Sequence, residues 1–175
     1  MSNDRTLVLS TVTATIRAPI EKVDIADWLF NLADAEYQRC SPAHLAAGTT
    51  TTDDGRPMSI NVEAIGDALI IEHYVAEVRE PHLCRMVSIS DFITASGRTK
   101  VRVEWELSVK PIDRGHCEYS NHVHAAATDE FLAFLEKNGI TFEQARAANQ
   151  AVADSHNREE TPNFAKSIER RALLR

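Results

Sequence analysis

The chain has 175 residues and a formal net charge of −7, and it is 43% hydrophobic and 26% charged. This composition is typical of a folded globular protein, and a chain of this length buries roughly 70% of the surface that its unfolded form exposes. The acidic balance opposes nonspecific binding to phosphate backbones and anionic membranes. We therefore expect one domain over residues 1–175, no nucleic-acid partner, and no disulfide or metal needed for folding.

The cysteines and the absence of long apolar segments indicate the compartment. Cys40, Cys84 and Cys117 are odd in number and have no C-x-x-C spacing, which argues against a disulfide framework and a zinc ribbon and favours buried, inert thiols. No segment approaches the roughly 20 apolar residues of a membrane span, and the N-terminus lacks an apolar stretch suited to a signal sequence. We expect a cytoplasmic protein with no membrane insertion.

The first third of the chain predicts one strand and then short helices. Residues 5–17 are rich in Val, Thr and Ile, and they end at Ala18-Pro19, where a proline cannot extend a strand. From Ile20 the apolar residues recur at helical spacing, which predicts a helical turn and two short helices before Pro42.

From His44 to Thr128 the apolar residues recur with period two. Turn-forming residues divide this region into a meander of six strands. The turns are at Asp53-Asp54-Gly55, Gly66-Asp67, Glu80-Pro81, Ser96-Gly97 and Asp113-Arg114-Gly115.

After Thr128 the period returns to 3.6 residues. Asp129 opens a short helix that Gly139 ends, and Thr141 caps a longer helix through about His156. Thr161-Pro162 begins a third helix, with proline at its first position. Residues 157–175 are therefore interpreted as a C-terminal helical extension.

The hairpin turns predict a strand register. They place Ile60 opposite His73, His73 opposite Ser88, Ser88 opposite Trp105, and Trp105 opposite Val123 on the buried face. The same face also carries Met58, Val62, Ile71, Val75, Met86, Ser90, Val103, Leu107, Asn121 and Ala125. The solvated face is then expected to carry Ser59, Asn61, Glu72, Tyr74, Glu104, Glu106, His122 and His124.

The order of these elements is that of the helix-grip fold. The segment IRAPIEKVDIADWLFNLADAEYQRCSPAH resembles the opening of the SRPBCC superfamily, which includes START-type lipid-transfer domains, polyketide cyclases and pathogenesis-related allergens. The resemblance rests on Ile16, Ala18, Pro19, Glu21, Val23, Leu29 and Tyr37. It implies an α+β domain with a seven-stranded antiparallel sheet curved around a long C-terminal helix, and a cavity for apolar ligands between sheet and helix.

The expected ligand-binding residues are polar or aromatic groups on the predicted buried face: His73, Ser88, Ser90, Trp105, Tyr119 and Asn121. His73 is also the candidate acid or base, because imidazole titrates near neutrality. A histidine satisfied within the core, for example by Ser88, is the alternative for this position. Trp105 is equally compatible with a core role.

No catalytic fingerprint or metal motif is present in the sequence. His122 and His124 face Glu106 and Glu104 in the predicted register, an arrangement that could hold a divalent cation, but such pairs are common on solvated sheet faces. His156 and Glu160, four residues apart, could likewise belong to a cation site and are equally compatible with a pair on a helix surface. We therefore expect no metal and no cofactor.

Three functions remain open at this stage. The first is the binding of a hydrophobic or aromatic small molecule, and the second is a cyclase or dehydratase that uses His73 with Asn121 or Tyr119. The third is a partner-binding protein, which would expose an apolar stripe along Phe164, Ile168 and Leu173. A homodimer is also left open.

Overall fold

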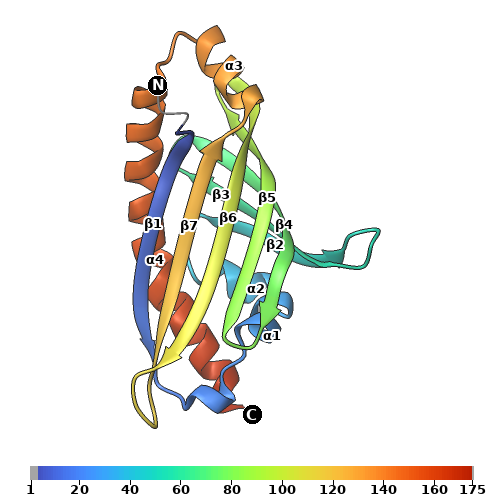
Figure 1. Cartoon of the computed structure of the whole chain (residues 1–175), viewed down its shortest axis with the longest axis vertical. Helices are drawn as coiled ribbons and strands as arrows, with labels where there is room; N and C mark the ends of the chain where they lie inside the picture. Colours follow the sequence, from blue (N-terminus) through green and yellow to red (C-terminus); the bar gives the residue numbers. More distant parts are fainter. Residues whose placement is uncertain (1–3, 175) are drawn as a thin grey trace.

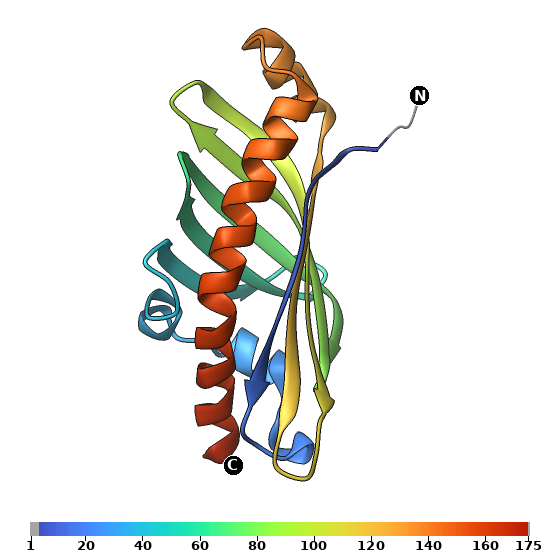
Figure 2. The ribbon, with the colours of Figure 1, turned by 90° about the vertical axis from the view of Figure 1, so that its left-hand side faces the viewer.

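A computed structural model describes residues 4–174 of the chain. A curved, seven-stranded antiparallel sheet in the order β1-β7-β6-β5-β4-β3-β2 wraps around one long helix, α4 (Figures 1 and 2). The strands are β1 Thr6–Ile16, β2 His44–Thr51, β3 Pro57–Ile65, β4 Ala68–Glu80, β5 Leu83–Thr94, β6 Gly97–Pro111 and β7 Cys117–Ala127. The helices are the 3-10 turn η1 Ile20–Lys22, α1 Ile25–Phe30, α2 Asp34–Gln38, α3 Asp129–Lys137 and α4 Phe142–Leu173.

This architecture confirms the predicted fold class. The six strands from His44 onward and the two short helices after the first strand are present, and α4 lies along the concave side of the sheet (Figure 2). The three cysteines are buried free thiols, as expected. No helix in residues 4–174 is long and apolar enough to cross a membrane.

The predicted register is correct at two hairpins. Ile60 pairs with His73 across β3 and β4, and Trp105 pairs with Val123 across β6 and β7. Between β5 and β6 the pairing is shifted by two residues from the prediction. Trp105 pairs with Met86, and Ser88 pairs with Val103. A shift of two residues keeps each side chain on its face, and the inner faces of β5, β6 and β7 are therefore as predicted.

The register between β4 and β5 is wrong, and a β-bulge is the cause. Near the turn Glu80 pairs with Leu83, but the register shifts by one residue between Ala76 and Val78. Because side chains alternate along a strand, a one-residue shift moves every residue beyond it to the opposite face of the sheet. Strands β4 and β3 therefore turn the predicted solvated residues inward: Ser59, Asn61, Glu72 and Tyr74 are buried.

The C-terminal helix is continuous, so the predicted break near residues 157–161 and the separate extension are wrong. Pro162 lies within α4, and it is on the exposed side of the helix, where water can solvate the carbonyl that loses its partner. On the opposite side, Phe164 and Ile168 are fully buried in the core. The apolar stripe required by the partner-binding hypothesis is therefore covered by the sheet, and only Leu173 of the three is exposed.

The start of α4 is defined by a capping box and by the turn before it. Thr141 accepts a hydrogen bond from the backbone of Gln144, and the Gln144 side chain bonds back to Thr141, which is a capping box. Gly139, at a φ of 66°, allows the turn between α3 and α4 that a residue with a side chain would strain. This turn lets α4 run back along the sheet and close the concave space.

Candidate functional site

The space between the sheet and α4 contains two small adjoining cavities. The inner one has about 60 Å³ and the other about 90 Å³, and both are lined by Ile65, Glu72, Val123 and Ala153. The second cavity is otherwise almost wholly apolar, with walls such as Leu7, Val101 and Val103. The interior therefore has an apolar stretch that leads to a more polar inner end.

A wider pocket of about 600 Å³ lies at the end of the sheet beside α3. Its walls include Phe92, Phe131, Phe134, Leu135 and Ile140, and the rings of Phe92 and Phe131 meet edge to face at 5.8 Å. Phe92 and Asn149 line both this pocket and the 90 Å³ cavity. The three spaces are thus neighbours that share lining residues, with the inner cavity at one end of the series and the wide pocket at the other.

Five of the six predicted ligand-binding residues lie buried on the inner face of the sheet: Ser88, Ser90, Trp105, Tyr119 and Asn121. Among them, Trp105 lines the inner cavity. Trp105 Nε1 donates to Asn121 Oδ1 at 2.7 Å, and Ser90 donates to Ser88 at 2.9 Å. Tyr119 Oη is buried without a hydrogen-bond partner in the described chain.

The expected inward orientation of His73 is wrong. Its side chain is 44% exposed, and its Nε2 lies 3.6 Å from the Asp91 carboxylate. Asp91 in turn accepts two hydrogen bonds from Arg98, at 2.7 and 3.1 Å. The β4 bulge is the reason, because it turns Glu72 and Tyr74 toward the interior in place of His73. A catalytic role for His73 inside the cavity therefore has no structural basis.

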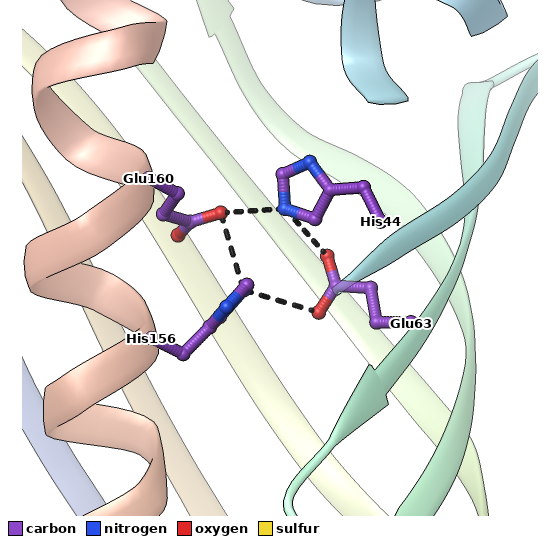
Figure 3. Close-up of side chains that lie close together, drawn as sticks. All are labelled: His44, Glu63, His156 and Glu160. Atoms are coloured by element: carbon purple, nitrogen blue, oxygen red, sulfur yellow. Dashed lines mark hydrogen bonds and ion pairs between the residues drawn. The ribbon is translucent and has the colours of Figure 1, made fainter. Parts of the chain in front are cut away.

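Four other side chains meet at the inner end of the cavity: His44 at the start of β2, Glu63 on β3, and His156 and Glu160 on α4 (Figure 3). His44 Nε2 lies 3.0 Å from Glu160 Oε2 and 3.5 Å from Glu63 Oε1. His156 Nε2 lies 3.4 Å from Glu160 Oε2 and 3.6 Å from Glu63 Oε2. We call these four residues the inner His/Glu cluster.

Surrounding groups hold the cluster in place. His44 Nδ1 lies 2.8 Å from the Tyr37 carbonyl oxygen, and the Tyr37 ring stacks on the His44 ring at 3.9 Å. The Tyr37 hydroxyl donates to Glu63. Asn121 Nδ2 donates to Glu160 Oε1 at 2.9 Å, and Trp105 orients Asn121. Two of the predicted site residues, Asn121 and Trp105, therefore support the cluster through Glu160.

Burial and charge shift the pKa values of the cluster in opposite directions. Burial alone would lower the pKa of His156, but the carboxylates of Glu160 and Glu63 raise it to about 9. Burial would raise the pKa of Glu160, but His156 and His44 hold it below its usual range. Burial and the nearby Glu160 charge raise the pKa of Glu63. The cluster thus favours charged imidazoles beside at least one carboxylate.

The sequence prediction for His156 and Glu160 is wrong in its location. The side chains of Glu160 and His156 are 6% and 11% exposed, so the pair is interior and not on a helix surface. His44 and Glu63 were not identified as site residues, because they are far apart in the sequence and Glu63 falls on a strand whose face depends on the bulge. The signal that was present is the i, i+4 spacing of His156 and Glu160, which places both side chains on one helix face.

Comparisons with known proteins indicate the fold. A scan against protein-family models and a search of curated protein sequences both found no match. Among solved structures, the chain resembles Zhui aromatase/cyclase from Streptomyces sp. R1128 at 14% identity and a TM-score of 0.67, covering 95% of each chain. It also resembles a START superfamily protein from Mycobacterium smegmatis, at 12% identity, 95% and 97% coverage, and a TM-score of 0.52.

A third similar structure is a norcoclaurine synthase from Thalictrum flavum, at 14% identity, with 99% of this chain and 98% of that chain covered and a TM-score of 0.54. These likenesses span nearly the whole of each chain. They show that the chain has the START-like, helix-grip fold of SRPBCC proteins, as its opening segment indicated. Proteins of this fold include cyclases, so the fold by itself does not separate binding from catalysis.

Proposed function

We propose that the chain binds a hydrophobic or aromatic small molecule between the sheet and α4. The observation that carries this proposal is the series of three neighbouring spaces, in which the wide pocket shares Phe92 and Asn149 with the 90 Å³ cavity, and that cavity shares Glu72 and Ala153 with the inner one. Ligand sites are usually concave and mostly apolar, with a few polar groups that orient the ligand. The series has this composition, with its polar groups gathered at the inner end.

The sizes of the spaces suggest how a ligand would lie. Small-molecule sites usually enclose about 300–1,000 Å³. The wide pocket, at about 600 Å³, is in this range, whereas the cavities of about 90 and 60 Å³ are narrower. The bulk of the ligand would occupy the pocket lined by Phe131 and Phe134, and a slim end would extend past Phe92 toward Trp105. Ser88, Ser90, Tyr119 and Asn121 would then shape the polar surroundings of that end.

Cavity-filling substitutions on α4 test this proposal. Ala153 lines both inner cavities, and Ala151 on the same helix is exposed, so Ala153→Phe and Ala151→Phe form a matched pair. Ala148 and Ala147 form a second pair, because Ala148 lines the wide pocket and Ala147 is exposed. The two variants of a pair carry the same substitution in the same helix, so its effect on helix propensity is the same in both. They differ in whether the new side chain points into a cavity.

The readout is the binding of an environment-sensitive apolar dye to the purified protein, with native mass spectrometry to detect any small molecule that co-purifies. We expect Ala153→Phe and Ala148→Trp to weaken dye binding by about tenfold or more, which corresponds to about 1.4 kcal/mol. Ala151→Phe and Ala147→Trp should bind as the unmodified protein does. Equal dye affinity within both pairs would place the binding site elsewhere and contradict the proposal.

A further inference from the structure

The inner His/Glu cluster has the spacing of a metal site. A tetrahedral zinc site with bonds of about 2.0–2.1 Å to nitrogen and oxygen separates its donors by about 3.3–3.4 Å. The four His–Glu distances in the cluster are 3.0 and 3.4 Å from Glu160 Oε2, and 3.5 and 3.6 Å from the two oxygens of Glu63, one facing each imidazole. All four donor atoms lie within 4.8 Å of one another. The side chains therefore surround one common point, as Figure 3 shows.

The hydrogen bonds of the histidines leave the right atoms available. His44 Nδ1 donates to the Tyr37 carbonyl, so in the neutral ring Nε2 carries the lone pair, and this atom points at the two carboxylates. His156 Nε2 is buried and lacks a hydrogen-bond partner of good geometry in the described chain. Two imidazole nitrogens and two carboxylates thus face each other, an arrangement that a cation between them, or a proton on each ring, would stabilise.

The outer shell of the cluster is that of a metal centre. Metal-binding histidines usually donate their other ring N–H to a carbonyl or carboxylate, and metal-binding carboxylates usually accept further hydrogen bonds. Here the Tyr37 carbonyl orients His44, the Tyr37 hydroxyl bonds Glu63, and Asn121 bonds Glu160. Each of these three side chains is therefore held in place by a neighbouring group, and Glu63 Oε2 and Glu160 Oε2 accept none of these supporting hydrogen bonds.

The charge of the region also suits a dication. Glu63 and Glu160 are buried together, and among residues 4–174 the histidines grouped with them are His44 and His156. A divalent ion bound by two carboxylates and two neutral imidazoles forms a neutral unit, which removes most of the cost of burying these charges. Nitrogen and oxygen donors without thiolate suit zinc, ferrous iron, cobalt and manganese.

We propose that His44, Glu63, His156 and Glu160 bind one divalent transition-metal ion, with zinc as the reference ion, at the inner end of the cavity. Three of the four residues, Glu63, His156 and Glu160, also line that cavity, so the bound ion faces the space that leads outward. The site is independent of the small-molecule proposal, because it requires only the four side chains and the ion.

Zinc titration of the purified, chelator-treated full chain tests the site. Isothermal titration calorimetry with ZnCl₂ should give one bound ion per chain. His156→Gln and Glu160→Gln, which keep a polar side chain of similar length but remove the imidazole nitrogen or the carboxylate charge, should each weaken zinc binding by at least about tenfold. The control is the double variant His122→Ala/His124→Ala, which removes the two histidines of the outer sheet face and should leave that binding unchanged.

Two results would overturn the site: no stoichiometric zinc binding by the unmodified chain, or a loss of binding in the outer-face double variant with none in the cluster variants. If a cluster variant fails to fold, the unmodified protein decides the question. In a zinc-soaked crystal, the anomalous signal should lie about 2.0–2.2 Å from donors of all four residues. An ion bound only elsewhere on the molecule would contradict the proposal.

Discussion

The molecule contains two groups of histidines and glutamates, and they differ in what surrounds them. The inner cluster combines side chains from β2, β3 and α4, and its Glu160 is 6% exposed. The outer group lies on neighbouring strands, with Glu104 paired with His124 and Glu106 paired with His122. The residue types are the same, but the side chains of the inner cluster are at most 11% exposed, whereas Glu104 and Glu106 are 29% and 32% exposed.

The outer group, Glu104, Glu106, His122 and His124, makes ordinary surface contacts. Glu104 and Glu106 are 29% and 32% exposed, and their carboxylates lie 3.5 and 3.7 Å from arginine side chains. The histidines bond threonines of β1, with His122 Nδ1 at 2.7 Å from Thr11 Oγ1. Water and salt screen such interactions, so they contribute little to stability. The comparison shows that burial, and not the presence of His and Glu together, makes a candidate site.

The largest effect is expected from removing one carboxylate of the inner cluster. Glu160→Ala removes the nearer carboxylate from two buried imidazoles and one acceptor from the Asn121 amide, which should lower the free energy of unfolding by about 3–5 kcal/mol. Urea denaturation at neutral pH measures it. The matched change on the outer face, Glu104→Ala, should cost about 0–1 kcal/mol. Equal losses in the two variants would show that the groups are not energetically distinct.

A smaller effect is expected from deleting one hydroxyl beside each group. Tyr37→Phe removes the donor to buried Glu63, and leaving that oxygen short of a partner should cost about 1–3 kcal/mol. Thr11→Val removes the hydroxyl bonded to His122, which water can replace, so a change within about 0.5 kcal/mol is expected. Thermal or urea unfolding of the two variants should separate them. A Thr11→Val loss as large as that of Tyr37→Phe would contradict the comparison.

A partly exposed ion pair between Glu36 and Arg170 links α2 to α4. Burial would raise the pKa of Glu36, but hydrogen bonds from Arg39, Ser167 and Arg170 hold it at about 2. Because the folded pKa is below the ordinary value of 4.5, the contribution is complete above that pH and is lost as the pH falls toward 2. Solvent screening limits it to about 1 kcal/mol.

The measurement for this pair is the unfolding free energy of the unmodified chain minus that of Glu36→Gln, followed from pH 7 downward. The difference should be constant above about pH 5 and should shrink below it. A difference that grows on acidification would show that the charged form of Glu36 is not the stabilising one.

The smallest effect is expected at His73. Its side chain is 44% exposed beside Asp91 and lies on the outer face, so His73→Ala should change stability by no more than about 0.5 kcal/mol. Dye binding should be unchanged. A loss of dye binding in this variant, with stability retained, would return His73 to the ligand site.

Local pattern was sufficient for most of the fold. The period-two region between His44 and Thr128 predicted the six strands, and the prolines and glycines predicted where the elements change. The Gly66-Asp67 turn predicted the pairing of Ile60 with His73, because a two-residue hairpin allows one register. Strands β6 and β7 also matched in register, through the pairing of Trp105 with Val123.

The predicted inward and outward faces were wrong where one extra residue in β4 interrupted the alternation of side chains. The sequence AEV at Ala76–Val78 carries no turn or glycine signal, yet the chain bulges there and exchanges the faces of β4 and β3. The predicted interior placed His73 inside and Glu72 outside, and the structure has the reverse. Similarly, Pro162 predicted a helix start, but packing of Phe164 and Ile168 against the sheet keeps α4 continuous.

By itself, the sequence determined most of the kinds and order of the elements and the inner faces of β5, β6 and β7, and the resemblance of its opening segment implied the helix-grip architecture. These features depend on local periodicity and on turn residues, which act over a few positions of the chain. Only the tertiary structure decided that His44, Glu63, His156 and Glu160 meet. Their meeting depends on a bulge in β4 and on a continuous α4, and residues 116 positions apart reach one point only after the sheet has curved around the helix.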